Sequence, residues 1–165
     1  STTCTIDLLM PDDSSAGFGS GSQSKSTCTY AVKYTGTVDA WLAADVLVET
    51  GTPSLYTGAS NGLQYKVKVA GGPTLVNGTT FTSEAGSNTQ VDAGSSVSNM
   101  LLSSNPAVEG DELEFNIDYL LPRLAPNALQ GGSSTITITF HAVQSANQPL
   151  GSCAAGRQCN AITWY

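Results

Sequence analysis

The chain has 165 residues, which is enough for one well-buried domain and too few for two of ordinary size. Its formal net charge is −7 with only 6 Lys and Arg residues, which argues against nucleic-acid binding because phosphate recognition needs clustered positive charge. Charged residues form 12% of the chain, about half the usual share, and abundant short hydroxyl side chains suit exposed sheet faces, so composition favours an all-β protein.

Residues 1–26 are predicted to form an N-terminal strand and a connector. Alternating side chains indicate a strand at residues 3–9, which Met10 and Pro11 end. Residues 14–26 are rich in Ser and Gly and carry almost no apolar side chains, which predicts a flexible connector. This arrangement makes the first strand a tethered terminal strand suited to donor-strand exchange.

Residues 27–150 are predicted to form the core of a β-sandwich. Alternation predicts strands at residues 27–34, 63–69, 112–121 and 136–143, and the apolar run at 38–49 predicts a central strand. Around the start of the last of these strands, one face carries Ile136, Ile138 and Phe140, and the opposite face carries Thr135, Thr137 and Thr139.

Turn-forming residues separate the expected strands. Residues 71–73 (Gly-Gly-Pro) predict a hairpin, and residues 109–111 (Glu-Gly-Asp) predict a turn before a strand. Residues 91–102 carry apolar side chains without clear alternation, and we expect a short helix or turn there. Seven to nine short antiparallel strands connected in this way predict a single-domain, jelly-roll-like β-sandwich.

Residues 151–165 are predicted to form a disulfide loop followed by a terminal strand, because residues 160–165 are apolar and aromatic. Cys153 and Cys159 bracket a short Gly-containing loop and are paired locally, so Cys4 and Cys28 pair by elimination among three connectivities. Two disulfides favour an oxidising compartment. A structural zinc site needs closely spaced ligand pairs, and neither cysteine pair has that spacing.

Three segments together resemble one protein family. Residues 5–8 (TIDL), residues 26–40 (STCTYAVKYTGTVDA) and residues 119–148, which hold the last strand, are similar to the TasA/camelysin family of secreted bacterial surface and biofilm-fibre proteins. The resemblance implies a structural subunit of an extracellular filament, in a biofilm matrix or on a cell surface. It also implies that the partner is the protein itself, with other matrix components as further partners.

In this family the N-terminal segment builds the fibre, and the resemblance implies β-strand complementation between subunits. We carry the donor role over to Thr5, Ile6, Asp7 and Leu8, which the connector tethers to the core. Residues 162–165 are the alternative donor. A further alternative is a monomeric secreted sandwich whose first strand packs in its own domain.

The sequence provides little for catalysis. His141 is the one histidine, expected on a strand surface, and neither an HExxH nor a GxSxG motif is present. Acidic residues cluster at residues 12–13 and 109–114 without EF-hand spacing and are expected to be solvated turn formers. We therefore expect no enzymatic activity, metal or cofactor. The alternatives are a monomeric adhesion or carbohydrate-binding module and, third, a secreted metallopeptidase, as camelysin-type relatives are classed.

Two observations concern localisation and modification. No apolar run approaches the roughly 18 residues of a membrane span, and the chain starts at Ser1 without an initiator Met, as expected for a secreted chain after signal cleavage. Asn77 begins the sequon Asn-Gly-Thr in a turn-like segment and is a candidate glycosylation acceptor.

Overall fold

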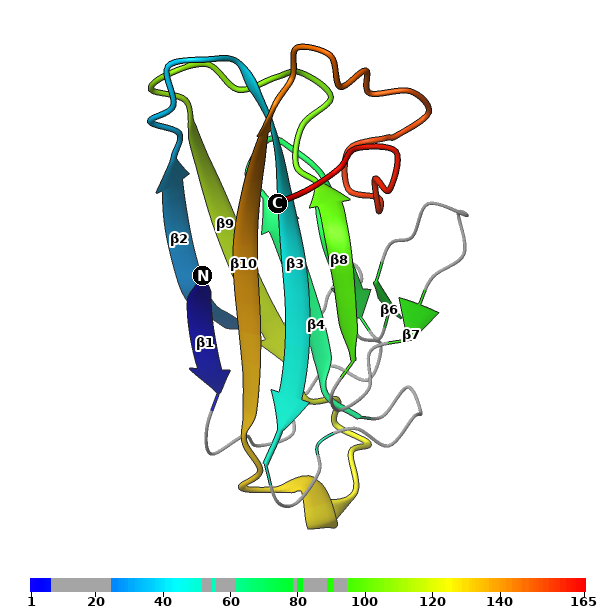
Figure 1. Ribbon diagram of the computed structural model, residues 1–165. Coiled ribbons are helices and arrows are strands. Elements are labelled where there is room, and N and C mark those ends of the chain that lie inside the picture. Colours follow the sequence, from blue (N-terminus) through cyan, green and yellow to red (C-terminus); the bar gives the residue numbers. More distant parts are fainter. Residues whose placement is uncertain (7–24, 52–54, 56–61, 79, 82–88, 91–94) are drawn as a thin grey trace.

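A computed structural model shows two antiparallel sheets packed face to face (Figure 1), and describes residues 1–6, 25–51, 55, 62–78, 80–81, 89–90 and 95–165. The four-stranded sheet has the order β1 (Thr2–Ile6), β10 (Ser134–Gln144), β3 (Ala40–Thr50), β8 (Ser96–Leu101). The six-stranded sheet has the order β2 (Lys25–Lys33), β9 (Glu112–Leu120), β4 (Gln64–Val69), β5 (Thr74–Gly78), β6 (Thr80–Phe81), β7 (Thr89–Gln90). A 3₁₀ turn, η1 (Asn127–Leu129), precedes β10.

This strand order is that of a jelly roll. Consecutive strands β1 and β2 lie in opposite sheets, as do β3 and β4, and the late strands β9 and β10 insert between early ones. Every paired strand in the described residues is antiparallel. The expected all-β, jelly-roll-like sandwich is therefore confirmed, with β6 and β7 as two-residue additions to one edge.

The core lies between the sheets and follows the alternation of the sequence. Ile136 and Ile138 of β10 face Phe115 and Ile117 of β9, and all four are fully buried. The ring of Phe115 packs against that of Phe140, with centroids 4.9 Å apart. Each such side chain contributes about 1.5–3 kcal/mol when fully buried, so this layer supplies much of the stability.

One buried chain of hydrogen bonds links the two sheets near the lower end of β10. The phenol of Tyr65 in β4 donates to Ser134 Oγ at 2.7 Å, and Ser134 Oγ donates to the carbonyl oxygen of Glu49 at 2.6 Å. Tyr65 and Ser134 are both buried, so these bonds satisfy hydroxyl groups that would otherwise destabilise the core.

Both predicted turns occur as expected. The Gly-Gly-Pro turn joins β4 to β5, and Gly110 has φ +94° in the turn that precedes β9. A left-handed φ is costly for residues with a Cβ, which explains glycine at position 110. Asp111 Oδ2 accepts the backbone N–H of Val108 at 2.9 Å and closes this turn.

The expected helix or turn within residues 91–102 is wrong, because Ser96–Leu101 forms the strand β8. Asn99 has φ +61° beside a register shift in the β3–β8 ladder, and Asp45 Oδ1 accepts its N–H at 2.8 Å. This irregularity places Val97 and Met100 on the same buried face although three positions separate them. Residues 91–94 lie outside the described residues.

The C-terminal segment also differs from prediction, because residues 160–165 form turns and coil, not a strand. Ile162 is 3% exposed and packs with Trp41, Leu101 and Val143 in a second apolar cluster, on the outer face of the four-stranded sheet. The apolar residues of this segment are buried because the loop packs on the sheet. The same apolar composition led to the prediction of a strand.

The Cys153–Cys159 disulfide closes that loop, as predicted. The loop also bonds to the upper edge of β8, where Leu101 N–H donates to Arg157 O at 3.0 Å and Gly156 N–H donates to Leu101 O at 2.6 Å. The upper end of this sheet edge is therefore occupied by the chain's own C-terminal segment (Figure 1).

Candidate functional site

The candidate site is the half-covered edge of β10. β10 pairs with β3 along its whole length, from Ser134 to Gln144. β1 pairs with β10 only from Ile6↔Ser134 to Thr2↔Ile138. Residues 139–144 therefore have no partner strand on the β1 side among the residues that the structure describes, and Figure 1 shows β1 beside only the lower part of β10.

The backbone groups at this edge can be assigned from the neighbouring ladder. Ala40 exchanges two backbone hydrogen bonds with Ala107, and Leu42 O accepts one from Leu102 N. The backbone N–H and C=O groups of the even-numbered residues at this end of β3 therefore point away from β10. Along a strand, the backbone N–H and C=O groups of successive residues point alternately to the strand on one side and to the strand on the other. In an antiparallel ladder, two directly paired residues therefore either both point their backbone groups at each other or both point them away. The odd-numbered residues of β10 thus bond to β3. The N–H and C=O groups that face the uncovered edge belong to Phe140, Ala142 and Gln144.

A cavity of about 210 Å³ lies behind this edge, between the two sheets. Val32 of β2 and Leu113 of β9 line it from one sheet, and Leu42 of β3 and Phe140 of β10 line it from the other. These four apolar side chains pack against the core yet remain only partly buried. The upper part of the sandwich therefore has an apolar groove beside an uncovered strand edge.

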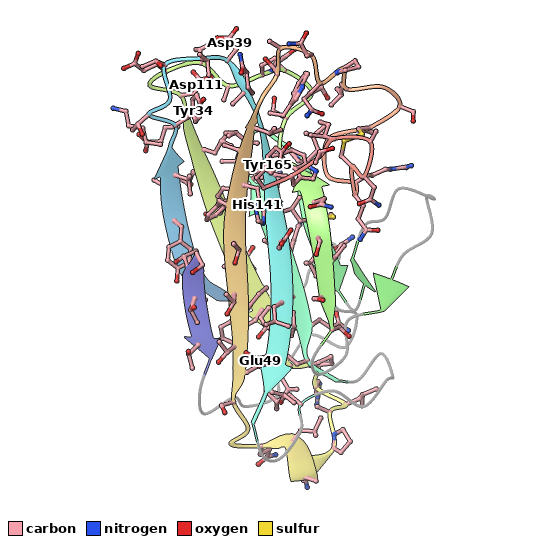
Figure 2. The ribbon with its side chains drawn as sticks, in the orientation of Figure 1. Tyr34, Asp39, Glu49, Asp111, His141 and Tyr165 are labelled. Atoms are coloured by element: carbon pink, nitrogen blue, oxygen red, sulfur yellow. A yellow bond between two sulfur atoms is a disulfide. The ribbon has the colours of Figure 1, made fainter. Side chains whose placement is uncertain are left out.

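The upper wall of the groove is fixed by Tyr34. Its phenol donates to Val38 O at 2.6 Å, its N–H donates to Asp111 O at 2.8 Å, and its carbonyl accepts from Gly110 N at 2.9 Å. Gly36 lies so close beneath the ring that a Cβ there would collide with it. Figure 2 shows Tyr34 and Asp111 together at this end of the molecule.

β1 closes the lower half of the same slot. The Cys4–Cys28 disulfide, with a Cα–Cα distance of 6.2 Å, joins β1 to β2 in the opposite sheet. The phenol of Tyr30 in β2 donates to Thr3 O at 2.6 Å. The predicted pairing of Cys4 with Cys28 is thus confirmed, and both cysteines lie in strands as expected.

The predicted donor residues are only partly described. Thr5 and Ile6 lie in β1, in register with Thr135 and Ser134 of the same chain. Asp7 and Leu8 lie outside the described residues, as does the connector up to residue 24. The candidate glycosylation acceptor Asn77 is exposed and lies in β5, in register with Thr80 of β6.

His141 has a structural environment on the outer face of β10. Its Nε2 lies 2.9 Å from Asp45 Oδ2, and its Nδ1 lies 3.4 Å from Tyr165 O. Asp45 is also bound by the N–H of Asn99, as described above. The histidine thus joins the C-terminal residue to β3, and Figure 2 shows Tyr165 beside it.

The described residues contain no group of three or more His, Cys, Asp or Glu side chains placed to hold a metal ion. Exposed acidic residues gather around the turn before β9, at Glu109, Asp111, Glu112 and Glu114. Residues 12–13 lie outside the described part of the chain. In that part, no helix is long and apolar enough to cross a membrane.

The groove was not found by sequence reasoning. The sequence led us to expect β-strand complementation between subunits, but it did not indicate which strand edge or which groove would receive the donor strand. Comparison of the chain with protein-family models, with curated proteins and with solved structures found no match. The geometry of the groove must therefore support a functional assignment by itself.

Proposed function

We propose that the protein is a structural subunit of an extracellular filament, in a biofilm matrix or on a cell surface, that polymerises by β-strand complementation. The observation that carries this proposal is the uncovered edge of β10 at Phe140, Ala142 and Gln144, beside an apolar groove. An exposed strand edge is a template for pairing with another chain.

The chemistry of the groove suits an incoming strand. Backbone groups of that strand would bond to Ala142 and its even-numbered neighbours, which supplies affinity without regard to side chains. Alternate side chains would enter the cavity and cover Val32, Leu42, Leu113 and Phe140. Burial of such apolar surface contributes about 25 cal/mol per Å². Residues 139–144 contain no Lys or Pro, the residues that commonly prevent edge pairing.

A second copy of the chain is the occupant that the molecule favours. The edge strand β1 already shows that this slot accepts an extended segment with alternating side chains, and every copy carries such a segment. Donation from one copy to the next is a heterologous contact, which does not close and so propagates a filament. The resemblance to secreted fibre proteins, together with the two disulfides, supports an extracellular location.

The N-terminal segment, with Thr5, Ile6, Asp7 and Leu8, remains our proposed donor. The alternative donor at residues 162–165 is held in its own domain: Ile162 is buried, and the indole of Trp164 donates to Cys159 O at 2.8 Å. Release of that segment would expose the second apolar cluster, whereas release of β1 would break its ladder to β10 and the Cys4–Cys28 bond.

Substitutions at Ala142 test the proposal. Its N–H faces the uncovered edge, so Ala142→Pro removes a donor that the incoming strand needs and leaves the β10–β3 bonds in place. Ala142→Lys adds a charge at the same edge, and Ala142→Ser is the matched control because it keeps the N–H and the size. Negative-stain microscopy should show filaments for wild type and Ala142→Ser, and folded monomer for the Pro and Lys variants.

The two blocking variants act by different means, so a folding defect in one does not decide the result. Circular dichroism and thermal unfolding establish which variants are folded. Normal filaments from folded Ala142→Pro and Ala142→Lys would overturn the proposal. Wild-type protein that stays monomeric at every concentration would favour the adhesion or carbohydrate-binding module instead.

A further inference from the structure

The uncovered stretch of β10 is short and has an end on each side. At its lower end, β1 begins with Thr2 in register with Ile138. At its upper end, β10 stops at Gln144, beside the wall that Tyr34 fixes. Residues 139–144 remain uncovered among the described residues, and at about 3.4 Å per residue they span about 20 Å. The groove therefore has room for one short strand.

The groove requires a strand with one apolar face. Directly paired residues of antiparallel strands carry their side chains on the same face of the sheet. Side chains opposite Phe140 and Ala142 therefore point into the groove, toward Val32 and Leu113. The side chains between them point outward. An incoming strand must thus be apolar at alternate positions, whereas the positions in between can carry charge.

The residues that follow β1 have this pattern. Among the stretches of the chain outside the described residues, only this one has two large apolar side chains two positions apart, Leu8 and Met10. Asp7 and Leu9 lie on the opposite face of an extended strand, and the carboxylate of Asp7 excludes that face from an apolar groove. Pro11 follows and limits the strand to this short stretch.

These residues cannot reach the groove of their own subunit while β1 is in place. Ile6 is in register with Ser134, and Ala142 lies eight residues further along β10, about 27 Å away. The four residues from Ile6 to Met10 span at most about 14 Å when fully extended. The groove that Leu8 and Met10 can fill is therefore that of a second copy.

We infer, on the basis of the proposed function, that subunits stack end to end: Leu8 and Met10 of one copy enter the groove of the next, while β1 stays in its own ladder. β1 ends at the lower end of the sandwich, and the groove lies at the upper end (Figure 1). A strand that continues β1 downward thus meets β10 of the next subunit in the antiparallel direction. Residues 11–24 span up to about 48 Å, enough to return to Lys25 at the start of β2.

The interactions that hold β1 are kept in this arrangement. The disulfide to β2, the hydrogen bond from Tyr30 and the ladder to β10 all remain within one chain. Thr5 and Ile6 anchor the donor in its own subunit, and Leu8 and Met10 bind the neighbour. Assembly therefore needs neither release of β1 nor reduction of its disulfide.

Two adjacent leucines provide matched variants. Leu8→Asp places a carboxylate in the apolar groove, whereas Leu9→Asp places one on the outer face. Circular dichroism establishes that both variants are folded. Negative-stain microscopy should then show filaments for wild type and Leu9→Asp, and none for Leu8→Asp. Equal behaviour of the two variants would overturn the inference.

Synthetic peptides test the same contrast without altering the folded chain. A dye-labelled peptide of residues 5–11 (TIDLLMP) is mixed with wild-type protein, at protein concentrations below those that give filaments, and binding is measured by fluorescence polarisation. We expect the Leu8→Asp peptide to bind about tenfold more weakly, because it loses the burial of one leucine, and the Leu9→Asp peptide to bind normally. Ala142→Pro protein should bind none of them. Equal affinities of the three peptides for wild-type protein would contradict the inference.

Other outcomes separate this arrangement from the proposed function. Filaments should form with both disulfides intact and no thiol in solution; filaments that form only after reduction would mean that β1 leaves its ladder, which rejects the arrangement and keeps the filament. Filaments that Ala142→Pro blocks and Leu8→Asp does not would likewise reject only the donor residues. Wild-type protein that forms no filaments, yet discriminates between the Leu8→Asp and Leu9→Asp peptides, would support this docking and contradict the filament.

Discussion

The phenol of Tyr30 in β2 donates a hydrogen bond to Thr3 O in β1 at 2.6 Å, across the opening between the two sheets. The Cys4–Cys28 bond lies one residue further along β1. Together they hold the first strand to a sheet in which it has no ladder partner, since β1 pairs with β10 of the opposite sheet.

Tyr30→Phe should weaken this attachment. Loss of one hydrogen bond of this kind costs about 1 kcal/mol, and we expect the loss to appear as faster amide hydrogen exchange in β1. Tyr34→Phe is the matched control, because it removes a phenol bond of equal length, 2.6 Å, whose acceptor is Val38 O and not a residue of β1. Hydrogen exchange measured by mass spectrometry checks the difference. Equal protection of β1 in both variants would show that Tyr30 does not hold the strand.

The two disulfides should contribute unequally to stability. In the chain-entropy model, a disulfide stabilises the folded state by lowering the conformational entropy of the unfolded chain, and this effect grows with the length of the closed loop. The separations of 24 and 6 residues predict losses of about 3.5 kcal/mol for Cys4→Ser/Cys28→Ser and about 2.2 kcal/mol for Cys153→Ser/Cys159→Ser. Urea unfolding of the monomers measures both. A larger loss for the C-terminal pair would mean that its packing on the sheet, not loop closure, decides the stability.

A variant lacking residues 1–9 should accept a donor strand but provide none. We expect soluble monomer and no filaments from this variant alone, because each chain then lacks the segment that contains Thr5 and Ile6. Added to wild type in small amounts, it should shorten the filaments by ending their growth. Negative-stain microscopy measures filament length. Filaments from the truncated chain alone would transfer the donor role to the C-terminal segment.

Two Phe→Ala substitutions should lower the unfolding free energy by different amounts, because one side chain lies in the packed core and the other borders the groove. Phe115 is fully buried, and Phe115→Ala should cost about 3–5 kcal/mol of unfolding free energy. Phe140 borders the groove and is only partly buried, so Phe140→Ala should cost less, about 2–3 kcal/mol, while widening the cavity. Denaturant unfolding of both variants gives the comparison. Equal losses would indicate that the groove is filled in solution.

The alternation of apolar and polar residues predicted the regular strands of the fold, because this pattern can be read within each strand. The strands around Tyr65, Phe115 and Ile138 were found because their buried residues recur at every second position. β8 was missed because the irregularity at Asn99 breaks this period. The terminal strand was predicted wrongly because Ile162 and Trp164 belong to a loop that packs on Trp41, a contact between residues more than a hundred positions apart.

The uncovered edge depends on the register between β1 and β10, which the sequence of neither strand determines by itself. It arises because Thr2, at the start of β1, is in register with Ile138, in the middle of β10. Strand register across the sandwich is set by the packing of the whole sheet and by the Cys4–Cys28 bond. Sequence indicated which residues form strands and which cysteines pair, whereas the groove required the offset between two strands distant in the chain.

The C-terminal loop gives the four-stranded sheet two unlike sides. At its upper end, the side formed by β8 is occupied by residues 156–159, and the side formed by β10 is free within the described residues. A sheet with both sides free could add strands in two directions and thicken into a ribbon. With the upper end of the β8 side occupied, we expect a single docking direction for each subunit at this level of the sheet, so the proposed filament would have a head and a tail.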